Sequence, residues 1–182
     1  MLQSKHSAVL KLHLYLFPEP YIGLIDAPIV LLALNPGFDN DDPEWHKNPA
    51  MRKAVVENFT EVPRPYPFYP LNPKLANSPV AKWWGRLLAP WLTSDPKQRQ
   101  QVANRILAVD LFPYHSRQCG VDLSDIQTLY SYRYTCELVS NAMDRGALIL
   151  ILRSERNWQD AVPKLTKYSR VYHLTVGGRW LS

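Results

Sequence analysis

The chain has 182 residues, of which 46% are hydrophobic and 20% are charged, so it is long enough for one domain with a sizeable core. This composition excludes a disordered chain, and no apolar run reaches the length of a membrane span. The formal net charge of +5 is compatible with a polyanionic partner such as nucleic acid but does not require one. We therefore expect one folded domain over residues 1–182, with no membrane segment.

The N-terminus and the cysteines indicate the compartment. Residues 1–17 mix charged and apolar side chains and lack both the apolar core and the cleavage site of a signal peptide. Cys119 and Cys136 are too few for a cysteine-ligated zinc or iron–sulfur site. We expect both to be free thiols and the protein to be cytoplasmic.

The first predicted strand, Ile29–Leu34, follows a proline-rich segment, FPEPYIG, that we expect to pack over the sheet edge. The strand is an unbroken apolar run, which is typical of a strand buried on both faces. The residues after it, Asn35-Pro36-Gly37, predict a tight turn, because proline fixes φ and glycine permits a positive φ. This turn lies at the carboxyl end of the strand, where open α/β sheets bind ligands.

Three helices are predicted next, each behind a capping residue and a proline. They begin at Asn48-Pro49, Ser78-Pro79 and Asp95-Pro96 and run to about residues 59, 92 and 105. Between the first two, the proline-rich residues 61–79 exclude both a helix and a central strand. The aromatic side chains of this segment predict that it is ordered against the rest of the protein.

The second half of the chain alternates strands with helices. Strands are predicted at Ile106–Phe112, Ala147–Leu152 and Arg170–Val176, and helices over residues 129–145 and 157–167. The last helix is expected to be interrupted, or to begin late, because of Pro163. Such alternation is typical of a parallel sheet with helices on both faces. The predicted fold class is therefore α/β, a three-layer α/β/α arrangement around a central four-stranded parallel sheet.

The carboxyl ends of these strands should bring four turns together, at residues 35–39, 110–116, 153–155 and 173–179. We expect an active site there. The chain has no P-loop, no GxGxxG and no GxSxG. Its five histidines show no metal-ligand spacing, so we expect no metal and no cofactor.

Two of these turns carry a resemblance to a known family. The segments LNPGF, residues 34–38, and ILAVDLFPYHSRQCGVDLSDIQTL, residues 106–129, flank an aromatic-rich helix behind a proline-rich loop. In this order the chain resembles the uracil-DNA glycosylase superfamily, in its single-strand-selective and mismatch-specific branches, over roughly residues 21–176. The resemblance implies that family's fold and hydrolysis of the N-glycosidic bond of a damaged or modified base in DNA, single-stranded DNA included, without a cofactor.

The resemblance also implies roles for particular residues. Asn35 would position the attacking water, Phe38 would stack on the flipped base, and Asp110 stands where the family has the Asn that reads the base edge. His173 stands in for the histidine that stabilises the leaving base. The same pocket is expected to hold further base contacts and an aromatic rim: Gly37 and His115, then Tyr66, Phe68 and Tyr69.

The chain departs from the family pattern at two places. Residues 173–180, HLTVGGRW, replace a His-Pro-Ser-Pro-like loop. An ionised Asp110 only accepts hydrogen bonds, whereas the protonated acid both donates and accepts, as the amide of Asn does. The alternatives are therefore a non-catalytic member of the same fold that binds a nucleotide, nucleic acid or a protein partner, and an N-glycosidase of free nucleosides or nucleotides.

Overall fold

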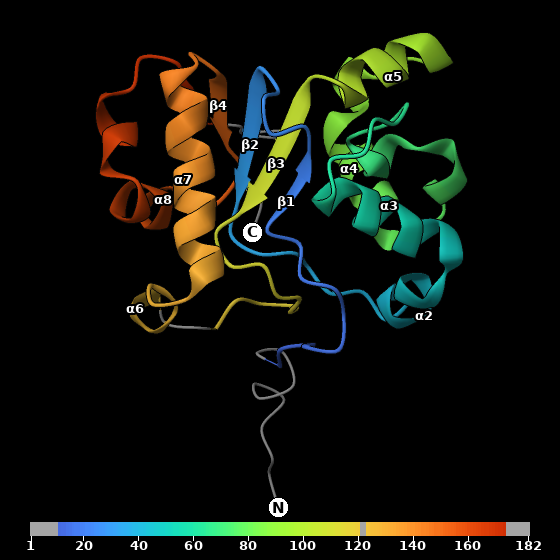
Figure 1. Cartoon of the computed structure of the whole chain (residues 1–182), viewed down its shortest axis with the longest axis horizontal. Coiled ribbons are helices and arrows are strands. Elements are labelled where there is room, and N and C mark those ends of the chain that lie inside the picture. The colour runs from blue at the N-terminus through green and yellow to red at the C-terminus, as the bar shows by residue number, and fades with distance from the viewer. Residues whose placement is uncertain (1–10, 121–122, 174–182) are drawn as a thin grey trace, which may run out of the picture.

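The computed structural model describes residues 11–120 and 123–173. Within these residues the chain forms a five-stranded sheet in the order β1-β3-β2-β4-β5. Figure 1 shows the strands between two groups of helices. The strands are β1 (Tyr21–Gly23), β2 (Ile29–Ala33), β3 (Ile106–Asp110), β4 (Leu148–Ile151) and β5 (Val171–His173).

The sheet is mixed, which corrects the expectation of four parallel strands. The four predicted runs form β2 to β5, and each pairs in parallel with its neighbour. The fifth strand, β1, lies in the segment that we expected to pack over the sheet edge, and it pairs antiparallel with β3. A strand of three residues is too short to show a hydrophobic period. Gly23 has a φ of +116°, and a Cβ there would lie 2.2 Å from the Ile106 carbonyl oxygen, so the end of β1 requires glycine.

The apolar run of β2 is explained by two hydrophobic cores, one on each face of the sheet. Val30 and Leu32 pack into the core under α7 (Tyr130–Asp144) and α8 (Glu155–Ala161). Leu31 and Ala33 pack into the core under α3 (Pro49–Phe59) and α4 (Pro79–Leu88). Because successive side chains point to opposite faces, a strand covered on both sides must be apolar throughout.

Glycine and proline mark the ends of the helices on the α7 side of the sheet. Helix α7 is followed by Gly146, whose φ is +77°, as expected for a helix stop. The predicted helix over residues 157–167 is divided by Pro163 into α8 and the 3-10 helix η4 (Pro163–Lys167). Trp158 of α8 is fully buried, and its Nε1 donates to the Ala33 carbonyl oxygen at 2.9 Å.

Capping residues begin the helices of the other face. Asn48, Ser78 and Asp95 each accept hydrogen bonds from backbone N–H groups at the start of α3, α4 and α5 (Pro96–Ala103). Helix α4 is shorter than predicted, because the chain tightens into the 3-10 helix η3 (Ala89–Trp91) around Pro90. Two short helices were not expected, α2 (Asp42–Lys47) and α6 (Leu123–Ile126). In the part of the chain that the structure describes, no helix is long and apolar enough to cross a membrane.

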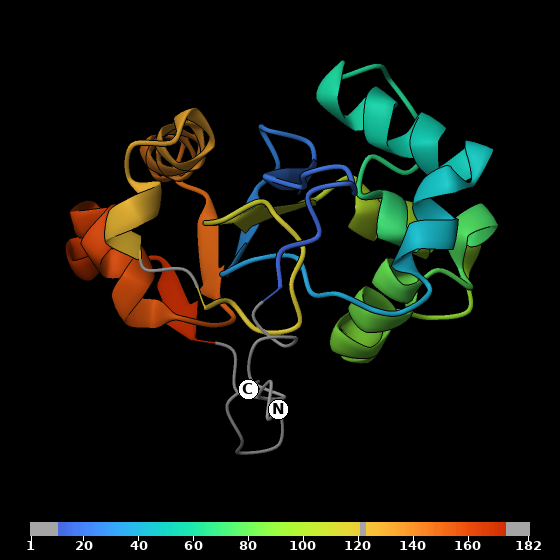
Figure 2. The same cartoon turned by 90° about the horizontal axis from the view of Figure 1, so that it is seen from below.

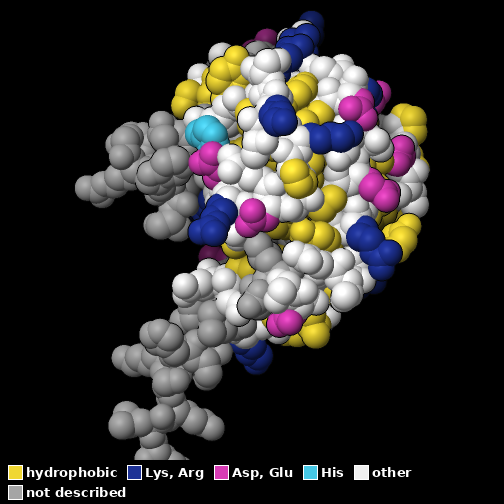
Figure 3. All heavy atoms as spheres, turned by 90° about the vertical axis from the view of Figure 1, so that its left-hand side faces the viewer, with side chains coloured by type: hydrophobic (Ala, Val, Ile, Leu, Met, Phe, Trp, Pro, Cys, Tyr) yellow, Lys and Arg dark blue, Asp and Glu magenta, His cyan; other side chains and the backbone are white. Residues whose placement is uncertain are grey.

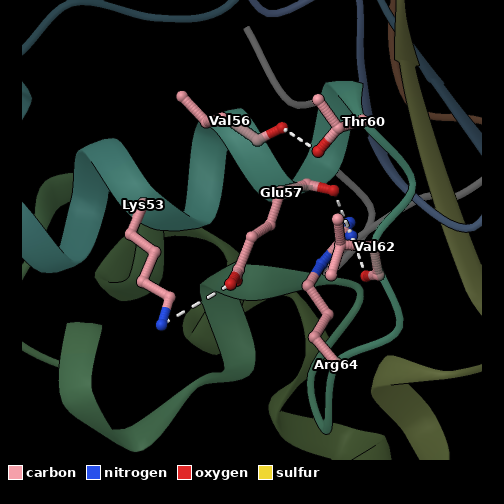
Figure 4. A network of polar contacts seen from close by, with 6 residues as sticks. All are labelled: Lys53, Val56, Glu57, Thr60, Val62 and Arg64. Atoms are coloured by element: carbon pink, nitrogen blue, oxygen red, sulfur yellow. Dashed lines mark hydrogen bonds and ion pairs between the residues drawn. The ribbon is translucent and has the colours of Figure 1, made fainter.

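The proline-rich segment is ordered, as expected, and contains the 3-10 helices η1 (Tyr69–Leu71) and η2 (Pro73–Leu75). Its anchor is Arg64, whose Nη1 donates to the carbonyl oxygens of Glu57 at 2.5 Å and Val62 at 3.0 Å, as Figure 4 shows. Nη2 of Arg64 donates to Oδ1 of Asn58, which also accepts from the N–H of Gly23 at 2.9 Å. The loop is thereby joined to the outer edge of β1.

Candidate functional site

A cavity of about 370 Å³ opens at the carboxyl ends of the parallel strands. Figure 2, seen from below, looks onto this edge of the sheet. The chain leaves β2 toward α2 and α3 on one face, and it leaves β4 toward α8 on the other. Diverging connections of this kind leave a crevice between neighbouring strands, where open α/β sheets bind ligands.

The cavity brings together five of the residues that sequence analysis selected. Its lining contains Asn35, Gly37, Phe38, Asp110 and His115. It also contains residues that sequence analysis did not assign to the site: Glu19, Asp42, Trp83, Trp84, Arg86, Arg117 and Arg153.

Four other expected site residues do not line the cavity. Phe68 and Tyr69 are 0% and 2% exposed and belong to the core under α4, and Tyr66 packs against the same core. His173 is exposed at the end of β5, where its Nε2 lies 3.4 Å from Oε1 of Glu155. His173 belongs to β5, which lies at one edge of the sheet. The remainder of the predicted last loop, residues 174–180, lies outside the described residues.

The side chain of Asn35 joins the turn after β2 to the turn after β3. Its Nδ2 donates to the Pro36 carbonyl oxygen at 2.7 Å and to Oγ of Ser116 at 3.0 Å. Longer contacts of the same nitrogen reach the carbonyl oxygens of Tyr114 and Ser116, both at 3.4 Å. Because Nδ2 is used within the protein, Oδ1 is the polar atom of Asn35 that remains to meet a water or a ligand.

Gly37 and Phe38 form the adjacent part of the lining. Gly37 does not adopt the positive φ that glycine permits, and a Cβ there would meet nothing within 4 Å. Its carbonyl oxygen instead lies 2.9 Å from Nδ1 of His115. The ring of Phe38 is stacked on His13, with centroids 3.4 Å apart and planes at 4°. Since His13 is not part of the lining, it supports the Phe38 ring without filling the cavity.

Asp110 is the last residue of β3 and is only 7% exposed. Among the described residues its Oδ1 has no hydrogen-bond partner. Burial, followed by the nearby carboxylate of Glu19, raises the pKa of Asp110 well above its ordinary value, while Arg153 acts in the opposite direction. A buried acid with a raised pKa holds its proton, so its carboxyl group can donate as well as accept.

Arg153 follows β4 and supplies a partly buried cation to the same cavity. Its Nε is buried and, in the described part of the chain, makes no hydrogen bond. The guanidinium carbon lies 5.7 Å from the centroid of the Trp83 ring, within cation–π range. We call Asp110 and Arg153 the unpartnered pair. Nε of Arg64 is also buried without a hydrogen-bond partner among the described residues, but Arg64 does not line the cavity.

A second polar group borders the cavity, and its members are hydrogen-bonded. Glu19, His46 and His115 are buried and bring one ligand-type atom each within 4.8 Å of one another. We call them the hydrogen-bonded cluster. Oε1 of Glu19 accepts from the Tyr69 hydroxyl at 2.8 Å, and Nδ1 of His46 accepts from the Phe17 N–H at 3.2 Å.

His115, the third member of this cluster, is also hydrogen-bonded. Its Nδ1 lies 2.9 Å from the Gly37 carbonyl oxygen, and its Nε2 lies 3.2 Å from the Phe17 carbonyl oxygen. A metal ion on these three side chains would have to take one ring nitrogen of His115 away from its carbonyl partner. The cluster therefore fits the role of a hydrogen-bonded support for the cavity wall, and we assign no metal to it.

Burial sets the charge of two further groups near the cavity. It lowers the pKa of His46 to about 4, with the charge of His115 acting in the same direction, so His46 is neutral at pH 7. Burial also raises the pKa of Asp42 to about 6, although a hydrogen bond from the Asp39 N–H, at 2.7 Å from Oδ2, opposes this shift. The cavity thus holds one carboxyl group that titrates just below neutral pH and one, Asp110, that stays protonated far above its ordinary pKa.

One part of the cavity lining is aromatic. Trp83 and Trp84 of α4 both line the cavity, and their rings meet edge to face with centroids 4.6 Å apart. Trp84 is buried and Trp83 is half-buried, as their adjacent positions on a helix predict. Arg86 and Lys82 are exposed on the same helix and line a second hollow beside the cavity.

The residues that sequence analysis missed had no local signal. Glu19 stands between two prolines before a strand too short to predict, and Arg153 is one of several arginines after an apolar run. Arg153 could be connected with the site only because the turn after β4 was expected to meet the turns after the other strands. Comparisons of the chain with protein-family models, with curated proteins and with solved structures found no match. A function for the chain therefore rests on its own residues and on the motifs described above.

Proposed function

We propose that this protein hydrolyses the N-glycosidic bond of a damaged or modified base in DNA, as members of the uracil-DNA glycosylase superfamily do. The observation that carries the proposal is the buried Oδ1 of Asp110, which has no hydrogen-bond partner among the described residues and lies in a cavity at the carboxyl edge of the sheet. An unpartnered buried polar atom is rare in a folded protein unless a ligand or water completes it. The cavity volume lies within the range of small-molecule sites.

The chemistry of Asp110 indicates the kind of base. A protonated carboxyl group presents one O–H donor beside one carbonyl acceptor. Uracil presents an N–H donor beside a carbonyl acceptor, so the two edges can form a pair of hydrogen bonds. The raised pKa of Asp110 supports this pairing, because the ionised carboxylate would repel the carbonyl oxygen.

Asn35 and Phe38 complete the arrangement that such a reaction needs. Glycosidic cleavage builds an oxocarbenium-like sugar, so the protein has to hold a water against the sugar carbon. Oδ1 of Asn35 can accept a hydrogen bond from that water, since Nδ2 is used within the protein. A base taken out of the stack loses its stacking energy, which the supported ring of Phe38 can partly replace.

The surface charge near the cavity is compatible with DNA. Lys82 and Arg86 lie on the exposed side of α4, and Arg117 lines the cavity and donates to Asn40. Arginine and lysine near a base pocket can neutralise the phosphates that flank a flipped nucleotide. By contrast, Figure 3 shows that the face built by α7 and α8 carries positive and negative side chains interspersed.

One observation favours a second function, binding without catalysis. The histidine expected to stabilise the leaving base, His173, is on the surface of β5 and does not line the cavity. A pocket without this group could still hold a nucleotide or a base through Asp110 and Phe38. The two functions differ in whether the glycosidic bond is cut after binding.

The test is a panel of single-stranded and duplex oligonucleotides, each with one modified base, assayed for abasic sites under single-turnover conditions. We expect excision of uracil or a related oxo-base by the parent and a large loss in Asn35→Ala. Free nucleosides in the same assay test the N-glycosidase alternative. Binding of an oligonucleotide without any abasic product would overturn the catalytic proposal and support the binding function.

A further inference from the structure

The reaction proposed above places a negative charge inside the cavity, and this inference rests on that proposed function. When the bond between the sugar carbon and the base nitrogen breaks, its electron pair stays with the base, which leaves as an anion. The oxygen of water forms the new bond to the sugar carbon and releases one proton, and the base takes up a proton later. A departing anion in a partly buried cavity is stabilised by hydrogen-bond donors or a positive group held beside it.

Arg153 is the cation with the burial to serve this purpose. Arg86 and Arg117 also line the cavity, but both are exposed to water. Arg153 is half-buried, and its Nε is enclosed by protein without a hydrogen-bond partner among the described residues. Water screens the exposed groups and weakens their attraction for a charge in the cavity, whereas a partly buried guanidinium acts at lower effective dielectric.

The order of the strands puts Arg153 on the opposite side of β2 from Asp110. Asp110 ends β3, Arg153 follows β4, and both strands pair with β2. Neighbouring strands are about 4.8 Å apart, so roughly 10 Å separates the two strand ends across the sheet. A planar base between them can meet Asp110 with one edge while Arg153 reaches another.

We propose that Arg153 stabilises the anion of the departing base, and that the substrate is therefore a base whose ring N–H is flanked by two carbonyl oxygens. Asp110 pairs with the N–H and one carbonyl oxygen, and Arg153 donates to the other oxygen, where charge accumulates as the bond breaks. Bases with an amino group at that position would place a donor against a cation and be rejected. Trp83 lies against the guanidinium and restricts its position.

The experiment compares Arg153→Gln and Arg153→Lys with Arg156→Gln, a matched change at an exposed arginine outside the cavity lining. Single-turnover excision is measured on oligonucleotides with uracil and with 5-fluorouracil, whose anion is the more stable leaving group. We expect Arg153→Gln to lower the uracil rate roughly 100-fold. The loss should be smaller for 5-fluorouracil, because a more stable anion needs less help. Arg153→Lys should recover part of the rate, and Arg156→Gln should behave as the parent.

A rate loss that is equal for both bases, in a variant with a native thermal transition, would overturn the inference, as would an unchanged rate. Binding of free bases provides a readout that needs no catalysis. The parent should bind 5-nitrouracil, which ionises near neutral pH, more tightly than uracil, and Arg153→Gln should lose this preference. If the parent excises no base, the proposed function fails, and equal affinity of the parent for these two free bases would then overturn the inference on its own.

Discussion

Two polar groups border the same cavity and differ in how their hydrogen bonds are completed. In the hydrogen-bonded cluster, Glu19, His46 and His115 each contact a partner from the protein at 2.8–3.2 Å. In the unpartnered pair, Oδ1 of Asp110 and Nε of Arg153 are buried with no partner in the described residues. Both groups consist of titratable residues at the carboxyl edge of the sheet.

This difference distinguishes residues that stabilise the folded protein from residues that can bind a ligand. A buried polar atom that is already paired lowers the energy of the folded protein and has little left to offer a ligand. A buried atom without a partner raises that energy, and a ligand that completes it removes the penalty. Changes in the cluster should therefore act mainly on stability, and changes in the pair mainly on binding and catalysis.

The largest expected effect is on activity, from Asp110→Ala. This change removes the group that reads the base edge, so excision should fall by a factor on the order of 100 or more. The free energy of unfolding should stay the same or rise, since a buried carboxyl group without a partner is lost. Single-turnover excision and thermal unfolding measure the two quantities. A strongly destabilised Asp110→Ala protein would show that the carboxyl group is a structural element.

The next effect concerns pH and the same residue. Because the pKa of Asp110 is raised, its neutral form persists in the folded protein, and excision of uracil should fall about tenfold per pH unit above that pKa. Asp110→Asn cannot ionise, so its rate should stay level and exceed the parent rate at high pH. A parent profile that rises through this range would contradict the assignment.

The stability of the parent should change with pH in the same direction. The folded state holds the Asp110 proton above the ordinary pKa, so the free energy of unfolding should decrease as pH rises from about 4 through the raised pKa. Asp42, with a pKa of about 6, contributes with the same sign between about 4 and 6. The contribution of Asp110 is the difference between denaturant titrations of the parent and of Asp110→Asn. Identical pH dependence in both proteins would contradict a raised pKa.

In the cluster, Glu19→Ala should destabilise the protein by about 1–3 kcal/mol, because it leaves the buried Tyr69 hydroxyl without its acceptor. The double change Glu19→Ala with Tyr69→Phe is the control. It removes both partners and should be less destabilising than the sum of the single changes, which urea denaturation can measure. Additive losses would show that the hydroxyl and the carboxylate do not depend on each other.

The smallest expected effect is at the mouth of the cavity. Lys82→Glu with Arg86→Glu should weaken binding of an oligonucleotide severalfold and reduce the dependence of affinity on salt concentration. Affinity for a free base should change less than affinity for the oligonucleotide, since both side chains are exposed and a free base carries no phosphate. Fluorescence anisotropy at two salt concentrations measures the first quantity. An unchanged salt dependence would place the DNA path elsewhere on the surface.

Local patterns were enough to predict most of the fold. A few neighbouring residues were enough to predict β2, β3 and β4 from their apolar runs, and the starts of α3, α4 and α5 from their capping residues. The failures were elements without a period to detect, such as β1 with three residues and α2 in an acidic stretch. Helix α4 is shorter than predicted because the chain changes to a 3-10 helix around Pro90, whereas an interruption at Pro163 was expected and is observed.

The candidate site was predicted in part, for a reason that sheet geometry explains. Asn35 and Asp110 were expected to meet because each follows a buried strand, and both line the cavity. The aromatic residues Phe68 and Tyr69 were expected at the rim because they lie in a proline-rich loop, but the loop packs into the core. Their hydrophobic area is better removed from water there than at an open cavity.

By itself, then, the sequence determined which segments become strands and which turns carry polar residues, because these depend on neighbours in the chain. Tertiary structure alone decided the order of the strands and the lining of the cavity, which includes Arg153 and Glu19 but not His173. It also decided that Asp110 is buried, which raises its pKa, and that its Oδ1 has no hydrogen-bond partner in the described part of the chain. Burial and strand order depend on contacts between residues far apart in the chain, and no local pattern contains them.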